Sequence, residues 1–76
     1  MKATEKILNL IKSKIELLNL YRSESESDGF KRKLSETRGM VIALNTISEI
    51  IYHIEYNDAD MLEIGYYTSN GEYKAA

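Results

Sequence analysis

The sequence contains no cysteine, no proline and no tryptophan among its 76 residues. Without cysteine the chain has neither disulfides nor thiolate metal ligands, and its single histidine, His53, leaves little else for a structural metal site. A chain shorter than about 80 residues rarely forms a self-sufficient core without disulfides, a metal or oligomerisation. We therefore expect one small domain, residues 1–76, that is completed by self-association or by docking on a partner.

Long hydrophobic runs are also missing. No segment approaches the roughly 20 apolar residues of a membrane span. Near the N-terminus the apolar residues are interrupted by Asn9, Lys12 and Lys14, whereas a signal-peptide core needs about 7–15 uninterrupted ones. We expect a cytoplasmic protein without a membrane partner.

The charges are unevenly distributed along the chain. Residues 1–38 carry nine Lys or Arg against six Asp or Glu, a net charge of +3, whereas residues 39–76 carry one Lys against six acids, a net charge of −5. This asymmetry indicates a surface for a charged partner and carries no information about the fold.

Residues 4–22 have the spacing of an amphipathic helix, because apolar residues recur at intervals of three and four. One stripe consists of Thr4, Leu8, Ile11, Ile15, Leu18 and Arg22. A second stripe beside it consists of Ile7, Leu10, Lys14, Leu17 and Tyr21. Together they form an apolar face broader than a two-stranded coiled coil requires.

Residues 23–29 are rich in Ser and Glu, which predicts the connection between two helices. Ser27 or Asp28 is the expected cap of the second helix. The alternation of Ser with Glu also suits a phosphoserine cluster, although a plain solvated loop is the simpler interpretation.

The spacing predicts a longer second helix over residues 30–56. At 1.5 Å per residue it would span about 40 Å, against about 28 Å for the first helix. Gly39 within it marks a bend, a close approach of another helix or a tolerated surface glycine. One seam of this helix consists of Met40, Leu44, Ile47, Ile51 and Ile54.

Residues 57–76 begin with a helix stop, Asn-Asp-Ala-Asp, and an Asn-Gly hairpin signal follows at positions 70 and 71. We expect a β-like hairpin or an extended tail here. A third helix starting at Asp60, with Glu63 in a capping box, is the alternative. The strand-like alternation runs through Leu62, Ile64 and Tyr66.

The combined pattern predicts a mainly α fold, an antiparallel two-helix hairpin with a short C-terminal β-like hairpin or extended tail. The apolar faces exceed what one hairpin buries, so we expect copies of the chain to form a helical bundle as a homodimer or higher oligomer. The expected self-association residues are Leu8, Ile11, Ile15, Leu18, Leu44, Ile47 and Ile51.

Few residues suit catalysis. None of the serines lies in a Gly-x-Ser-x-Gly turn, and the glycines form no phosphate-binding loop. On a helix, Glu49 and His53 would share a face and supply half of a metal site, although a helix-end hydrogen bond or ion pair for His53 is the simpler interpretation. We expect no catalytic residue, no metal, no cofactor and no enzymatic activity.

Tyrosine and acidic residues concentrate near the C-terminus, where five of the six tyrosines lie within residues 52–76. Tyrosine gives rigid amphipathic contact area, and acidic residues steer a surface toward basic ones. This predicts docking on another protein with a basic surface, which the docking would either block or position; packing of the tail on the helices is the alternative. The expected binding residues are Tyr52, Tyr56, Asp58, Asp60, Glu63, Tyr66, Tyr67 and Tyr73.

A basic cluster at the start of the second helix gives an alternative function in nucleic-acid binding. The acids Glu24, Glu26 and Asp28 lie beside it and would repel phosphate. A purely structural homo-oligomer is the third interpretation. The basic residues are Lys31, Arg32, Lys33 and Arg38.

Residues 4–56 resemble small helical-hairpin accessory proteins of bacteriophages and mobile elements, in their two helices, their apolar second helix and their high content of Ile, Lys, Asn and Glu. The resemblance does not extend to the tyrosine-rich tail. It implies a binding protein that acts stoichiometrically on host machinery, such as an inhibitor of a defence nuclease.

Overall fold

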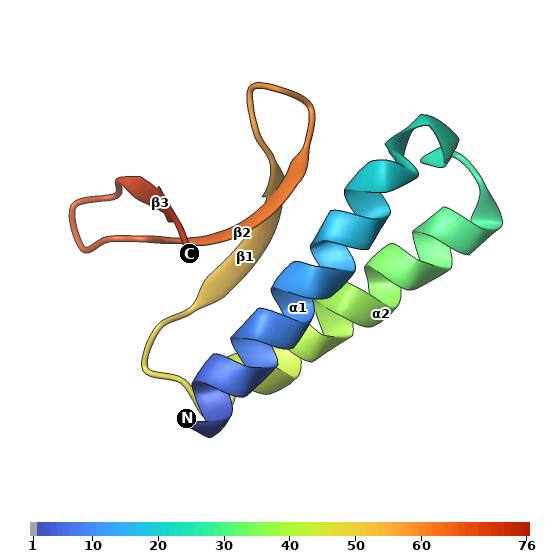
Figure 1. Ribbon diagram of the computed structural model, residues 1–76. Coiled ribbons are helices and arrows are strands. Elements are labelled where there is room, and N and C mark those ends of the chain that lie inside the picture. Colours follow the sequence, from blue (N-terminus) through green and yellow to red (C-terminus); the bar gives the residue numbers. More distant parts are fainter. Residues whose placement is uncertain (1) are drawn as a thin grey trace.

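The computed structural model describes residues 2–76. The helices lie side by side in one layer, and an antiparallel sheet with strand order β1-β2-β3 forms a second layer (Figure 1). The predicted helical hairpin is confirmed, whereas the C-terminal part is a sheet. The elements are α1 (Ala3–Leu20), the 3-10 helix η1 (Arg22–Glu24), α2 (Asp28–Asn45), β1 (Tyr52–Tyr56), β2 (Leu62–Tyr67) and β3 (Tyr73–Ala75).

The two helices of the hairpin are equal in length, with 18 residues each. Ser27 is the N-cap of α2, and its Oγ accepts a hydrogen bond of 3.2 Å from the backbone N–H of Phe30. Such a cap satisfies one of the backbone donors that the first turn leaves open. Neither helix within residues 2–76 is both long enough and apolar enough to cross a bilayer.

The second helix ends at Asn45 and not at residue 56, which corrects the sequence-based expectation. The Asn45 side chain turns to the first residue of β1, where its Oδ1 accepts from the Tyr52 N–H at 2.9 Å and its Nδ2 donates to the Tyr52 carbonyl at 3.0 Å. The chain after Asn45 is rich in β-branched residues, which favour extended structure over helix. Residues 52–56 therefore form a strand.

The C-terminal part was expected as a β-like hairpin or an extended tail, and it is a sheet in which β1 extends the antiparallel pair β2 and β3, so the alternative third helix is wrong. Strand β1 pairs with β2, with Ile54 opposite Ile64, and β2 pairs with β3, with Tyr67 opposite Tyr73. Side chains alternate between the two faces of a strand, so the buried Leu62 and Ile64 mark the face that contacts the helices.

Both strand connections use the same turn. In the first, the Asn57 N–H donates to the Met61 carbonyl and Asp60 has φ +62°. In the second, the Thr68 N–H donates to the Glu72 carbonyl and Gly71 has φ +82°. This is a three-residue loop that ends in a left-handed residue, for which glycine is the favoured amino acid.

Side chains from the helices also hold the open edges of the strands. Asn19 of α1 repeats the arrangement of Asn45, because its Oδ1 accepts from the Leu62 N–H at 2.8 Å and its Nδ2 donates to the Leu62 carbonyl at 2.9 Å. Arg38 of α2 donates from Nη1 to the Ile54 carbonyl at 3.3 Å. These bonds satisfy backbone groups that have no ladder partner, on the edge strand β1 and on the part of β2 that lies beyond the short β3.

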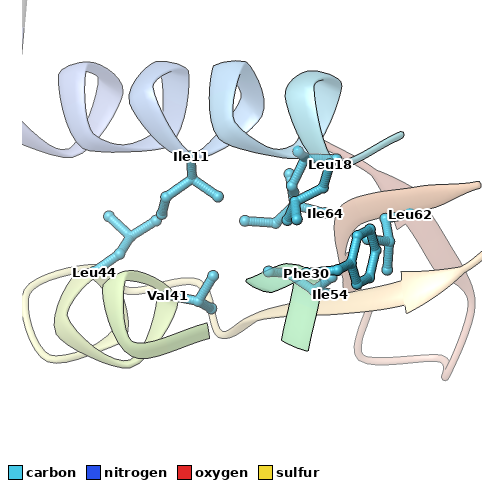
Figure 2. Packing of buried hydrophobic residues seen from close by; sticks show 9 residues of the cluster. Ile11, Leu18, Phe30, Val41, Leu44, Ile54, Leu62 and Ile64 are labelled. Atoms are coloured by element: carbon cyan, nitrogen blue, oxygen red, sulfur yellow. The ribbon is translucent and has the colours of Figure 1, made fainter. Parts of the chain in front are cut away.

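The core fills the space between the two layers (Figure 2). Four of the residues expected to mediate self-association, Ile11, Ile15, Leu18 and Leu44, are buried there beneath the chain's own sheet. Leu8 packs at the edge of this core, and Ile47 and Ile51 are exposed in the segment after α2. The sheet thus covers the first stripe of α1, whereas Leu10, Leu17 and Tyr21 of the second stripe stay exposed. The core side chains are Ile11, Ile15, Leu18, Phe30, Val41, Leu44, Ile54, Leu62 and Ile64.

Candidate protein-binding surface

The face of the sheet that points away from the helices carries aromatic and acidic side chains. Its residues alternate along each strand with the residues of the inner face, and the strand register sets them opposite one another. Strand β1 contributes His53 and Glu55, β2 contributes Glu63, Gly65 and Tyr67, and β3 contributes Tyr73 and Ala75. We refer to these seven residues as the outer sheet face.

Three aromatic rings pack edge to face across it. The ring centroids of His53 and Tyr67 lie 5.8 Å apart, and those of Tyr67 and Tyr73 lie 5.3 Å apart. Edge-to-face pairs at such distances are attractive beyond the area that they bury. The rings therefore form a connected aromatic strip over all three strands.

Tyr73 is positioned by the glycine beneath it. A Cβ atom on Gly65 would overlap the Tyr73 ring and the Lys74 carbonyl oxygen, so this close approach requires glycine. The Tyr73 hydroxyl oxygen is buried and makes no hydrogen bond with the described residues. Burial raises the pKa of Tyr73 to about 12, and the carboxylates of Glu63 and Glu55 contribute to the rise.

Two carboxylates lie side by side between these rings and the first turn. Glu55 is directly opposite Glu63 in the ladder. Glu55 Oε1 accepts a hydrogen bond of 2.7 Å from the Tyr67 hydroxyl, which raises the pKa of Tyr67, and Glu63 Oε2 accepts from Asn57 Nδ2 at 3.3 Å. Like charges directly opposite each other destabilise a sheet. A cation placed between the two carboxylates would relieve that repulsion.

A hollow of about 400 Å³ adjoins the aromatic strip. The apolar side chains of Ile50 and Ile51, both exposed, line it together with His53 and Tyr67. Glu49 lies at its border. The hollow extends the outer sheet face with apolar contact area next to an acidic group.

The residues that the sequence predicts for binding lie on different parts of the sheet. Glu63, Tyr67 and Tyr73 lie together on the outer sheet face. The register places three other tyrosines on the opposite face, and Asp58 and Asp60 lie in the turn between β1 and β2. Those three tyrosines are Tyr52, Tyr56 and Tyr66.

Tyr52 packs against the core, and its ring meets that of Tyr66 edge to face at 6.1 Å. Tyr66 also lines the hollow beside the aromatic strip. The helical spacing of residues 30–56 placed Ile50, His53 and Glu55 on a helix, so they were not predicted as binding residues. The alternation of residues 52–56 was the available signal for a strand. It would have put His53 and Glu55 on one face.

The basic residues of the alternative function do not all share one surface of α2, although Lys31 and Arg38, seven residues apart, lie on the same side of the helix. Lys31 forms an ion pair with Glu26 at 3.5 Å, and Lys33 lines a groove between the helices. Arg38 binds the Ile54 carbonyl on the sheet side. Arg32 lies between Lys31 and Lys33 in the sequence, so its side chain projects about 100° from each of theirs.

No three His, Asp or Glu side chains within residues 2–76 converge so that they could hold a metal ion. Glu49 and His53 are not helical neighbours, because residues 49–53 lead into β1 and continue as part of it.

Comparisons of the chain with protein-family models, with curated proteins and with solved structures gave no match.

Proposed function

We propose that this protein is a small non-enzymatic binding module that docks its outer sheet face on a basic surface of another protein. The observation that carries the proposal is the pair Glu55 and Glu63, held opposite each other beside three packed aromatic rings. No Lys or Arg occurs among the seven residues of the outer sheet face. The charge of this surface is therefore of one sign.

An arginine or lysine side chain suits this surface in two ways. Its charged group would approach Glu55 and Glu63, where a guanidinium can donate two hydrogen bonds to a carboxylate. Its aliphatic part or guanidinium plane would pack on the ring of Tyr67, which adds a cation–π attraction. Ile51 at the border of the hollow supplies apolar contact area around that contact.

A groove that binds nucleic acid is one basic surface of this kind, and a protein seated in it would exclude the nucleic acid. Inhibition of a nuclease is the form of this function that the resemblance to phage accessory proteins favours. The charge complementarity between an acidic face and a basic groove supports it, and also gives fast association.

The decisive variant is Glu55→Gln combined with Glu63→Gln, which removes two charges and keeps the size of the side chains. The matched control is Glu5→Gln with Glu16→Gln, two exposed acids of α1 that change the net charge equally. The probe is an eight-residue arginine peptide, titrated by calorimetry at low and at physiological salt. We expect the first variant to weaken binding by about tenfold or more and the control by less than twofold.

Equal weakening by the two variants would show that the peptide senses net charge alone, and the proposal would then be wrong. NMR spectra of the labelled protein provide a second readout. Peptide-induced shifts must cluster on the amides of His53, Glu55, Glu63, Tyr67 and Tyr73. Shifts centred on the helices instead would overturn the assignment.

A further inference from the structure

The first helix carries a second apolar seam that the sheet does not cover. Leu10, Lys14, Leu17 and Tyr21 follow one another at intervals of four, three and four, which is the spacing of a helix–helix seam. The two leucines and the tyrosine remain 52%, 55% and 54% exposed, respectively. The neighbouring seam of α1, with Ile11, Ile15 and Leu18, is buried in the core. One helix therefore presents two packing faces, of which a single chain uses one.

This seam borders a groove between α1 and α2. The groove has a volume of about 370 Å³ and is lined by residues of the two helices and their connection, with no strand residue among them. Leu18, Phe30 and Thr37 are its buried lining residues, and Leu17 and Tyr21 form its wall on α1. It is thus an apolar groove on the layer of helices, separate from the outer sheet face.

The charges around this groove are balanced. Lys14 and Lys33 are positive, Glu24 and Glu36 are negative, and all four line the groove. Lys14 belongs to α1 and Glu36 to α2, so the two helices contribute opposite charges to its walls. Because the four charges cancel, two copies do not repel each other at this groove, and a two-fold axis can bring Lys14 of one copy to Glu36 of the other, whereas the outer sheet face would repel its own copy.

We propose that a second copy of this chain occupies the groove. In this dimer, the exposed seam of α1 from each copy lies along the groove of the other around a two-fold axis. The four helices then form a bundle, with the two sheets on its outside. Self-association thus uses Leu10, Leu17 and Tyr21 in place of the residues buried in the core. It does not depend on the proposed function of the outer sheet face.

The test compares two leucines of α1. Leu17→Glu places a charge in the groove, and Leu20→Glu places the same charge on the same helix at a residue that is 77% exposed and does not line the groove. Sedimentation equilibrium of the full chain should show a dimer for the unchanged protein and for Leu20→Glu. Two copies of residue 17 enter the interface, so Leu17→Glu should raise the dimer dissociation constant by about a hundredfold. Circular dichroism must show unchanged helix content for both variants.

Spin labels provide an independent measurement, because the chain has no cysteine and each label needs one introduced cysteine. Ser13→Cys carries the label on α1, and Asn70→Cys carries it on the turn after β2, which projects away from the helices (Figure 1). Electron–electron distances between the two copies should be shorter for residue 13 than for residue 70.

Three results would overturn the proposal. They are a monomer at all concentrations up to the millimolar range, a dimer that resists Leu17→Glu, and a shorter distance for residue 70 than for residue 13. The last of these would indicate a dimer through the sheets. The variant with Gln at positions 55 and 63 should remain a dimer, so that failure of peptide binding and failure of self-association are distinguishable.

Discussion

The two outward surfaces of this protein differ in charge and in construction. The outer sheet face has carboxylates of one sign and aromatic rings held by cross-strand contacts, whereas the helical groove has an apolar lining and balanced charges. The two layers share one core, which contains the inward-facing apolar residues of both layers. The residues that remain outside differ between the two surfaces, and we propose different occupants for them because their charge balance differs.

The two proposals together predict a bivalent particle. In the groove-mediated dimer both outer sheet faces point outward, away from the bundle. Two binding faces on one particle raise the apparent affinity for a partner that presents two basic sites, without any new contact.

Among the substitutions considered, replacement of Gly65 should have the largest effect. It should impair the outer sheet face and leave the helical groove intact. In Gly65→Ala the new methyl group would overlap the Tyr73 ring, so β3 must shift, at a cost of about 1–3 kcal/mol in the free energy of unfolding. Binding of the arginine peptide should fall, because Tyr73 loses its place, while the dimer through the helices should persist. Urea unfolding, calorimetry and sedimentation measure these three quantities.

The control for this substitution is Gly39→Ala in the middle of α2, where no atom lies within 4 Å of the new methyl group. Alanine is the better helix former, so this change should stabilise the protein by about 0.5–1 kcal/mol. If both glycine variants shift stability in the same direction, the tight contact between Gly65 and Tyr73 does not exist in solution.

Alkaline pH should weaken the sheet through Tyr73. In the unfolded chain its pKa is near 10, and in the fold it is about 12, so the unfolded state loses the proton first as the pH rises. The contribution of Tyr73 to the free energy of unfolding is complete below pH 10 and is lost between pH 10 and 12. Wild type should therefore lose more stability over this range than Tyr73→Phe, as measured by urea unfolding at pH 9 and pH 11.5.

Deprotonation of lysines and of the other tyrosines affects wild type and Tyr73→Phe alike. The informative quantity is therefore the difference in stability loss between these two proteins. Tyr67, whose pKa is also raised, is retained in both. Parallel loss of stability in wild type and Tyr73→Phe would contradict the burial of the Tyr73 hydroxyl.

The smallest effect is expected in the turns, which border the outer sheet face but do not form it. Asp60 has a left-handed backbone, so Asp60→Gly should raise the free energy of unfolding by about 0.5 kcal/mol. Gly71→Ala, in the equivalent position of the other turn, should lower it by about 1 kcal/mol. Thermal unfolding curves would show midpoints that move in opposite directions, and shifts of the same sign would contradict the shared turn geometry.

The sequence predicted the helical hairpin and the strand character of residues 62–66, but it placed residues 46–56 on the second helix. Ile47, Ile51 and Ile54 satisfy the helical spacing of three and four, and this seam outweighed the alternation around Ile54. In the structure α2 ends at Asn45, and the Asn45 side chain makes two hydrogen bonds to the Tyr52 backbone at the start of β1. A side-chain contact across seven residues is not visible in a pattern of hydrophobicity.

The candidate site was partly predictable for the same reason. Tyrosines and acids near the C-terminus indicated a binding region, and Glu63, Tyr67 and Tyr73 belong to it. Composition does not say which face of a sheet a residue occupies, since a shift by one residue exchanges the faces. The separation of Tyr66 from Tyr67, neighbours in the chain, therefore required the strand register.

The two asparagines that bind the backbone of the strands, Asn45 and Asn19, close loops of very different length. Asn45 and Tyr52 are seven residues apart, whereas Asn19 and Leu62 are 43 residues apart. The entropy of loop closure differs between these lengths by about 1.6 kcal/mol, on the logarithmic dependence for flexible chains. The Asn45 contact therefore needs less chain entropy to close, and it joins the end of α2 to the start of β1. The Asn19 contact closes a much longer loop and joins the layer of helices to the central strand β2.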